Sequence, residues 1–322
     1  MINNWHHKGL FVFSDPGGAK PILAMAQARS ATEPYIVISD RKYAFYSDFG
    51  VEVNAYSEND ETLLLARYKP AFVCAGTSYT SRIELKFIQE ARRLSIPTYS
   101  FVDHWTSLKE RFWMDGSYMY PDHIGFPDKR ALDLALEQGI PASLLEICPN
   151  PYYDFLRKWR PSMSKREAFN SLGLDSEKMV LLYCPDPLSN VGGFAKFGMD
   201  EVTGLRMITA ALEKREDKHR YQILIQPHPN QNIKVFDEDI ARVNGFQVTV
   251  NTGDLDVNLL IFHSNLILGF FSNILLEAEL LGKPVGRLLG DLKTPDPFEH
   301  NRPGRLIYSE EDLQNLLSGI QN

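Results

Sequence analysis

Cysteine is scarce in this 322-residue sequence, which contains only Cys74, Cys148 and Cys184. Their number is odd, their spacing is wide and their neighbours are apolar, so buried thiols are expected rather than a disulfide framework. No group of His and Cys residues has the spacing of metal ligands. The sequence therefore predicts neither a bound metal nor a cofactor.

Long apolar runs and excess positive charge are also missing. No stretch approaches the roughly 18 apolar residues of a membrane span, and the N-terminal residues lack the apolar segment of a signal peptide. The net charge of −7 argues against a general nucleic-acid-binding protein. We therefore expect a cytoplasmic protein, with peripheral association at the inner face of the membrane left open.

Alternating strand and helix patterns run along the whole chain and predict an α/β fold with parallel sheets. The length favours two domains of about 150 residues. A charged segment with Pro161 and Ser162 separates two arrays of strands. The expected organisation is an N-terminal domain over residues 1–160, a linker over 161–177 and a C-terminal domain over 178–322.

In the first half, three predicted strands end in polar residues. The C-terminal ends of parallel strands lie at one edge of a sheet, where open α/β sheets bind ligands, so these side chains should converge there. A glycine pair lets the backbone pass close to a ligand, although this turn has no specific nucleotide-binding fingerprint. A tight structural turn and a helix cap are the alternatives. The candidates are Asp15, Gly17 and Gly18, then Thr77 and Ser78, then Asp103 and His104, with Lys109 and Arg111 following.

In the second half, two apolar strands stop at His228 and at Ser272-Asn273, and a helix follows the second strand. Free backbone N–H groups and the positive end of the helix dipole would lie near an imidazole, which predicts a phosphate site. Glu277 lies one turn into the helix. Each residue also has an ordinary structural role open to it: loop ordering for His228, an N-cap for Ser272 and solvent exposure for Glu277.

The sequence PHP over 227–229, together with FFSNILLEAELLGKPV over 270–285, resembles bacterial capsule and teichoic-acid-type transferases of the GT-B fold. The same nucleotide-sugar group includes UDP-N-acetylglucosamine 2-epimerase. Ser272 and Glu277 match the pattern, Asn273 replaces a serine, and Phe270 stands where an aspartate is usual. In the first half, residues 76–97, 103–112, 121–128 and 150–154 resemble polysaccharide-biosynthesis proteins. The resemblance implies two Rossmann-like domains whose parallel sheets face a cleft.

The resemblance implies metal-independent transfer of a sugar from a nucleotide-activated donor to a glycan or lipid-linked acceptor. His228, Ser272 and Asn273 would then hold the leaving phosphate, and Glu277 would bind the ribose. The base would be Asp15, with Asp103 or His104 as its rival. Thr77, Ser78, Lys109 and Arg111 would serve the acceptor side. The alternatives are a sugar-nucleotide epimerase or hydrolase on the same fold, or a non-catalytic binding subunit.

Overall fold

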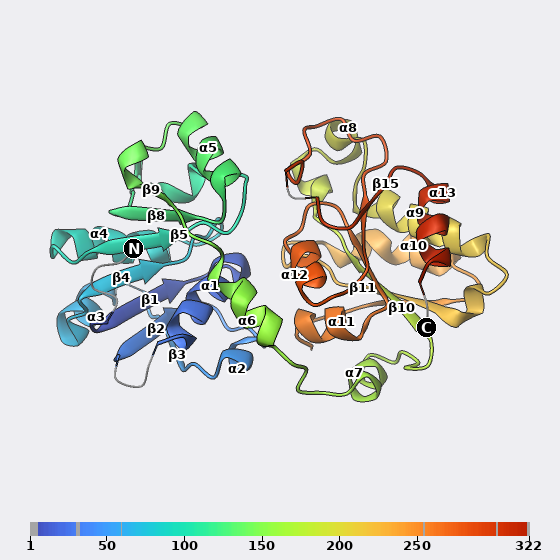
Figure 1. The fold of residues 1–322 in the computed structure, drawn as a ribbon, viewed down its shortest axis with the longest axis horizontal. Coiled ribbons are helices and arrows are strands. Elements are labelled where there is room, and N and C mark those ends of the chain that lie inside the picture. The colour runs from blue at the N-terminus through green and yellow to red at the C-terminus, as the bar shows by residue number, and fades with distance from the viewer. Residues whose placement is uncertain (1–5, 30–32, 59, 254, 301, 321–322) are drawn as a thin grey trace. The chain divides into compact units, whose positions relative to one another are not determined.

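The computed structural model describes residues 6–29, 33–58, 60–253, 255–300 and 302–320. The chain divides into two compact units, Met1–Lys158 and Trp159–Asn322, which are drawn in Figure 1. Each unit has one large sheet of parallel strands connected by helices. The predicted α/β class is therefore confirmed.

Unit 1 contains a seven-stranded sheet in the order β3-β2-β1-β4-β5-β8-β9, and a separate two-stranded sheet, β6-β7. The strands are β1 Gly9–Phe13, β2 Tyr35–Ser39, β3 Val53–Ala55, β4 Phe72–Ala75, β5 Thr98–Phe101, β6 Trp113–Met114, β7 Ser117–Tyr118, β8 His123–Phe126 and β9 Leu145–Ile147. The α-helices are α1 Pro16–Gln27, α2 Tyr46–Phe49, α3 Glu61–Tyr68, α4 Ile83–Arg93, α5 Lys129–Glu137 and α6 Pro151–Lys158. Short 3-10 helices span Glu110–Phe112 and Ala142–Leu144.

Unit 2 contains a six-stranded sheet in the order β12-β11-β10-β13-β14-β15. The strands are β10 Met179–Cys184, β11 Tyr221–Ile225, β12 Gln247–Val250, β13 Leu266–Gly269, β14 Val285–Leu288 and β15 Arg305–Ile307. The α-helices are α7 Lys165–Ser171, α8 Gly193–Phe197, α9 Glu201–Glu213, α10 Asp237–Arg242, α11 Val257–His263, α12 Ile274–Leu280 and α13 Glu310–Ser318. Three 3-10 helices span Leu188–Val191, Lys218–Arg220 and Ile233–Phe236.

The central strands of both sheets are mostly apolar, as expected of parallel strands with helices on both faces. Every residue of β1, β10, β11 and β13 is buried. The segment expected as a linker contains α7, and its Phe169 is buried in the core of unit 2 beside Leu224 and Ile267. The apolar side chain of Phe169 thus packs this segment against the core of unit 2.

The strand order of each sheet reverses direction at one point, and such a switch point opens a crevice at the C-terminal ends of the strands. In unit 1 the reversal falls between β1 and β4, and in unit 2 between β10 and β13. The loops that follow these four strands therefore line the two crevices. They contain Asp15 and Thr77-Ser78 in unit 1, and Asp186 and Ser272-Asn273 in unit 2.

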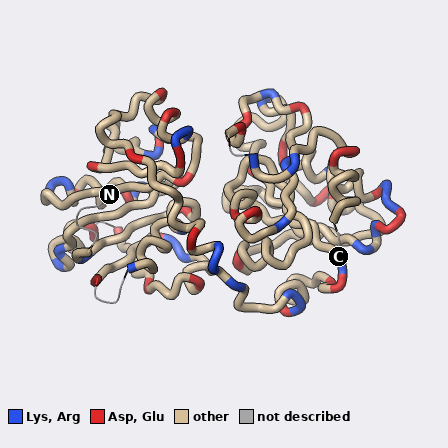
Figure 2. Tube along the Cα trace, in the orientation of Figure 1, with Lys and Arg blue, Asp and Glu red and all other residues tan. Residues whose placement is uncertain are grey.

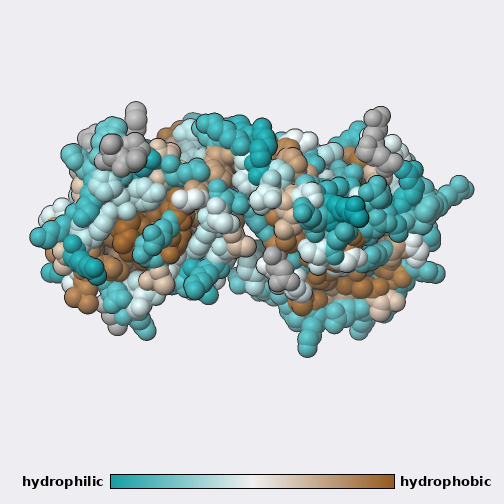
Figure 3. Space-filling model, turned by 90° about the horizontal axis from the view of Figure 1, so that it is seen from below, coloured by the Kyte–Doolittle hydropathy of each residue, from teal (hydrophilic) through white to brown (hydrophobic). Residues whose placement is uncertain are grey.

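Charged residues are interspersed in sign over both units, as Figure 2 shows. The face displayed in Figure 3 carries apolar patches on each unit among larger hydrophilic regions. Within the described ranges, the chain has no helix with the length and apolar character needed to cross a membrane.

Candidate functional site

At the switch point of unit 1, Asp15 organises the loop that follows β4. Its carboxylate accepts hydrogen bonds from the backbone N–H of Tyr79 at 2.7 Å and from the hydroxyl of Thr80 at 2.6 Å. The backbone N–H of Asp15 donates to Ser78 Oγ at 2.9 Å. The structure thus brings Asp15 and Ser78 together, as predicted from their strand ends, and gives the Asp15 carboxylate a loop-ordering role.

A buried carboxyl that the sequence analysis missed lies behind this pair. Glu84, in the first turn of α4, accepts a hydrogen bond from the Ser14 N–H at 2.9 Å and another from the Ser78 hydroxyl. The residue is 2% exposed. Burial raises the pKa of Glu84 to about 7, although the Ser78 hydrogen bond acts in the opposite direction. Glu84 therefore joins the ends of β1 and β4 and titrates near neutral pH.

A second polar group in unit 1 joins the loops that follow β4 and β5. Arg111 donates through Nη1 to Thr77 Oγ1 at 3.2 Å and to Asp103 Oδ1 at 3.4 Å. A methyl group at Gly17 would lie 2.3 Å from Asp103 Oδ2, and one at Gly18 would lie 2.8 Å from the Thr77 backbone. The two glycines therefore permit close approach of α1 to these residues, and no ligand is needed to explain them.

His104 and Lys109, two further candidates of unit 1, have other neighbours. The Nδ1 atom of His104 lies 3.2 Å from the Thr106 N–H and 3.0 Å from its hydroxyl. The Lys109 ammonium lies over the Tyr118 ring, 4.6 Å from its centroid. His104 thus contacts a residue of its own turn, and Lys109 lies against the β6–β7 hairpin.

At the switch point of unit 2, Asp186 follows β10 after one intervening residue, Pro185. Its Oδ2 atom accepts the backbone N–H of Phe271 at 2.9 Å, which links the loops after β10 and β13. The residue is partly buried. Burial raises the pKa of Asp186 to about 6, while the Phe271 N–H and Arg287 favour its charged form. The sequence signal was an aspartate between two prolines at the end of an apolar strand, but nothing local showed its partner.

Arg287 of β14 fixes the backbone of the same loop. The side chain is fully buried and forms a two-pronged ion pair with Asp296, in which Nη1 lies 2.9 Å from Oδ2. Its Nε–H donates to the Phe270 carbonyl at 3.1 Å. A buried arginine needs such partners because leaving its charge unpaired is costly. This pair therefore fixes the loop on which Phe271, Ser272 and Asn273 lie.

Phe270 departs from the usual aspartate of the motif, and the structure explains why an apolar residue fits. Its ring is completely buried and meets Tyr183 edge-on, with centroids 6.1 Å apart. A methyl group at Gly204 of α9 would lie 2.7 Å from the Phe270 ring and 2.3 Å from the Tyr183 hydroxyl. The absence of a side chain at Gly204 makes room for the aromatic pair. Phe270 is thus a core residue of unit 2.

The predicted phosphate-binding residues lie at the C-terminal edge of unit 2, on two strands separated by β10. His228 is exposed, and its Nδ1 accepts the Asn230 N–H at 3.1 Å. Ser272 Oγ accepts the Ile274 N–H at 3.4 Å, while Asn273 is the N-cap residue of the seven-residue helix α12. Neighbouring strands are about 4.8 Å apart. Because Asp186 is in the loop after the intervening strand β10, it lies between the two predicted groups.

Glu277 is 5% exposed, which excludes the solvent-exposed role considered for it. Its backbone N–H donates to the Asn273 carbonyl at 3.0 Å in the first turn of α12. A ribose contact for Glu277 stays a prediction.

A further buried carboxylate, Glu201 at the start of α9, fastens the loops after β10 and β11 together. Glu201 is 0% exposed and accepts hydrogen bonds from the Ser189 N–H at 3.1 Å and from Gln231 Nε2 at 3.0 Å. The side-chain amide of Asn190 donates to the Asn230 carbonyl at 3.1 Å. The loop that presents His228 is therefore tied to the loop that presents Asp186.

The described part of the chain contains no group of three or more His, Cys, Asp or Glu residues able to hold a metal ion.

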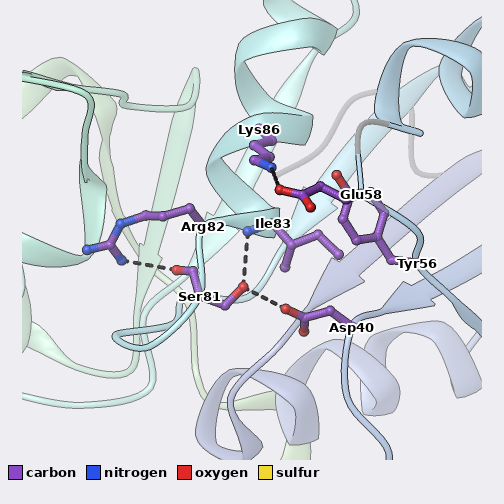
Figure 4. Close-up of a pocket in the computed structure, with 7 residues that line it drawn as sticks. All are labelled: Asp40, Tyr56, Glu58, Ser81, Arg82, Ile83 and Lys86. Carbon is purple, nitrogen blue, oxygen red and sulfur yellow. Dashed lines mark hydrogen bonds and ion pairs between the residues drawn. The ribbon is translucent and has the colours of Figure 1, made fainter.

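One pocket of about 330 Å³ opens in unit 1 between the ends of β2 and β3 and the start of α4, as Figure 4 shows. In it Ser81 donates to Asp40 at 2.7 Å, and Lys86 lies 4.0 Å from Glu58. A second pocket in unit 1, of about 360 Å³, is lined by aromatic and charged residues.

Of three comparisons with known proteins, one finds similar proteins. No protein-family model matches the sequence, and no curated protein matches it either. Solved structures do match over almost the whole chain. A UDP-GlcNAc 2-epimerase from Methanocaldococcus jannaschii aligns with a TM-score of 0.66 at 15% identity, covering 98% of this chain and 93% of that one.

Two more solved structures show the same likeness. UDP-GlcNAc 2-epimerase from Neisseria meningitidis, bound to UDP-GlcNAc, has a TM-score of 0.65 at 16% identity, covering 97% of this chain and 90% of that one. HepE from Anabaena, in complex with UDP-glucose, has a TM-score of 0.63 at 15% identity, covering 97% and 88% respectively. The predicted fold of two Rossmann-like units of the GT-B type is thereby confirmed.

These comparisons correct one prediction. We expected transfer of a sugar to a glycan or lipid-linked acceptor, but the structures that share the fold along the whole chain include several UDP-GlcNAc 2-epimerases. The expectation of a glycosyltransferase was therefore wrong, and the sugar-nucleotide epimerase considered beside it agrees with the comparisons. The acceptor-side roles of Thr77, Ser78, Lys109 and Arg111 lose their basis with it.

Proposed function

We propose that this chain binds a UDP-sugar and inverts the configuration of one carbon of the sugar. One observation carries the proposal: the fold matches UDP-GlcNAc 2-epimerases over 98% and 97% of this chain. The crevice at the switch point of unit 2 supplies residues suited to both parts of the task, binding a diphosphate and moving a proton.

The nucleotide diphosphate would bind at the edge of unit 2. His228 would donate a hydrogen bond to a phosphate oxygen from its exposed imidazole, whose orientation is set by the Asn230 N–H. Ser272 and Asn273 add a hydroxyl and an amide at the end of β13. Bonds between a charged phosphate and such donors are stronger than neutral ones. The ribose hydroxyls would be accepted by the carboxylate of Glu277.

Asp186 is the group in this crevice best suited to proton transfer. A general acid or base works best when its pKa lies near the operating pH, and burial raises the pKa of Asp186 to about 6. Its hydrogen bond to the Phe271 N–H fixes the orientation of the carboxyl. Inversion by proton transfer at C2 removes the proton from one face of the sugar and returns a proton to the other face, so a second acid–base group is needed. The electron pair of the broken C–H bond would be taken up by departure of UDP from C1, and UDP would rejoin C1 as the proton is returned.

The catalytic roles expected of Asp103 and Asp15 in unit 1 stay predictions. Asp103 is 6% exposed and is held by Arg111. Asp15 already accepts hydrogen bonds of 2.7 Å and 2.6 Å from the loop after β4. We therefore rank Asp103 ahead of Asp15, which reverses the order suggested by the sequence.

Incubation of the purified chain with UDP-GlcNAc alone tests the proposal. An epimerase needs no acceptor, so proton NMR should show the signals of the C2 epimer rising until an equilibrium mixture is reached. The same protein supplied with the epimer should approach the same mixture from the other side. The same assay with UDP-glucose shows which of the two sugars the chain accepts.

Two other outcomes would replace the proposal. Release of free UDP and sugar without any epimer would indicate a hydrolase. Stabilisation by UDP in a thermal-shift assay without turnover of either nucleotide sugar would indicate a binding subunit, since any ligand of the folded state raises its apparent stability.

A further inference from the structure

The second pocket of unit 1 is not used by the function proposed above. Its volume is about 360 Å³, and it is lined by Tyr79, Arg82, Glu110, Trp113 and Tyr118. Tyr79 and Arg82 come from the loop after β4. The other three come from the segment after β5 that forms a 3-10 helix and the β6–β7 hairpin. The volume is within the range of small-ligand sites.

Three aromatic side chains form the apolar walls of this pocket while remaining open to solvent. Tyr79 is 57% exposed, Trp113 is 42% exposed and Tyr118 is 40% exposed. Large rings left in water on a monomer are unusual when they gather in one place, and such groups mark binding sites. A ligand that covered them would bury apolar surface that folding left exposed.

The hairpin holds its rings in fixed positions. Trp113 and Tyr118 pair across the two strands, edge to face, with centroids 4.8 Å apart. Tyr118 also stacks on Tyr120 with an interplanar angle of 5°, and the Lys109 ammonium lies over the Tyr118 ring. Asp115 and Gly116 both have positive φ, as a tight two-residue hairpin turn requires. The rings of Trp113 and Tyr118 are thus held in place before a ligand binds.

Two side chains of opposite charge complete the lining. Arg82 carries N–H donors alone and Glu110 carries acceptors alone. In Figure 4 the Arg82 side chain extends away from Asp40 and Lys86 of the neighbouring pocket, while its Nη1 donates to the Ser81 carbonyl at 3.0 Å. Its guanidinium has five N–H donors in total.

We propose that this pocket binds a neutral saccharide ring. The C–H faces of a pyranose suit the aromatic walls, and each sugar hydroxyl both donates and accepts, so neighbouring hydroxyls can satisfy Arg82 and Glu110 together. One positive and one negative side chain line the pocket, so its charge favours neither a phosphate nor a cation over a neutral ligand. The ring could belong to a free glycan or to a nucleotide sugar, since both present the same chemistry.

Fluorine NMR of the full chain labelled with fluorotryptophan tests the proposal directly. The sequence contains four tryptophans, and Trp113→Phe identifies the resonance of Trp113. We expect N-acetylglucosamine or glucose at millimolar concentration to shift that resonance, and UDP to leave it in place. A shift with UDP-GlcNAc would identify a nucleotide sugar as the source. A shift with free sugars and none with UDP-GlcNAc would identify a free glycan.

Variants then test the lining. Tyr79→Ala should weaken sugar binding by about 10-fold, which corresponds to about 1.4 kcal/mol, because the apolar face of the sugar loses one of its three aromatic contacts. Glu110→Gln keeps an acceptor and adds a donor, and should weaken binding less. Tyr308→Ala removes a ring that is 55% exposed in unit 2 and should change nothing.

Two results would overturn the proposal. One is a Trp113 resonance that no sugar shifts at any concentration tested. The other is a Trp113 shift caused by UDP as strongly as by the sugars, which would assign the pocket to a nucleobase. Both results are separable from the failure of the proposed function, because sugar binding is measured without turnover and the assay for epimerisation does not depend on Trp113.

Discussion

The switch points of the two sheets are built alike but use their buried carboxyls differently. Each has a carboxyl whose pKa is raised by burial, Glu84 to about 7 and Asp186 to about 6. Glu84 is almost completely buried and binds the Ser14 N–H and the Ser78 hydroxyl. Asp186 is partly exposed and binds the Phe271 N–H beside the loop that presents Ser272 and Asn273.

On the proposed function, this difference separates a positioning group, Glu84, from a reacting one, Asp186. A carboxyl enclosed by backbone and hydroxyl donors holds two strand ends together and has no access to a ligand. A carboxyl with the same raised pKa at an open edge can exchange a proton with one. A shifted pKa therefore identifies a candidate, and accessibility decides its role.

Replacing Arg287 with Met should produce the largest effect, because it removes one member of a buried ion pair. We expect the free energy of unfolding to fall by about 3–5 kcal/mol, since Asp296 loses its partner. Urea unfolding followed by circular dichroism measures it. Lys214→Met, which breaks an exposed pair with Glu310 in the same unit, should cost about 1 kcal/mol or less. Equal losses in the two variants would mean that the Arg287 pair does not fix the edge of unit 2.

Replacing Asp186 with Asn should lower kcat/KM for UDP-GlcNAc by about 100-fold or more, the usual contribution of a general acid or base. Asn keeps an acceptor for the Phe271 N–H, so the loop should stay in place. The affinity for UDP, measured by calorimetry, should change little. A variant that retains normal turnover would remove Asp186 from the chemistry and leave it as a loop anchor like Glu84.

Glu84 should instead make stability depend on pH. Its pKa is raised from 4.5 to about 7 in the folded chain, so folding binds a proton within that window. Its contribution to stability is therefore greatest below pH 4.5 and is lost as pH rises to about 7, by at most about 3 kcal/mol.

Glu84→Gln should flatten this dependence. Unfolding free energies of the wild type and of the variant, measured from pH 4.5 to 7.5, should diverge with the wild type losing more stability as pH rises. Parallel curves would show that Glu84 is already ionised across the window. Glu84 and Asp186 would then share only their location at a switch point.

His228→Ala should have the smallest effect, a loss of about 10-fold in UDP affinity, corresponding to one hydrogen bond to a charged group. Calorimetry with UDP measures it. The control is His219→Ala, because His219 is also exposed in unit 2 and follows α9 rather than a strand end. Unchanged affinity in His228→Ala would locate the phosphates elsewhere on this edge.

The sequence predicted the strands and their polar ends because both depend on local patterns. Apolar runs such as those of β10 and β11 identify buried strands, and parallel strands bring their C-terminal ends to one edge. The positions of Asp15, Ser78, His228 and Ser272 at those edges followed from this rule. The same rule could have pointed to Asp186, which also follows a buried strand.

What the sequence did not show depends on contacts between distant residues. Asp186 meets Phe271 across 85 positions, and Ser14 meets Glu84 across 70. Phe270 departs from the usual aspartate of the motif, and only the structure shows that Gly204, having no side chain, leaves room for its ring. Local patterns say nothing about such pairs, so the partners that give these residues their roles emerged only from the fold.

The most direct test of the account is the reaction of UDP-GlcNAc in heavy water with the chain alone. If carboxyl groups remove and return a proton, the epimer formed should carry solvent deuterium at the inverted carbon, and Asp186→Asn should slow its appearance by about 100-fold or more. A UDP-GlcNAc sample that stays unchanged, with neither epimer nor deuterium after prolonged incubation with folded protein, would contradict the account.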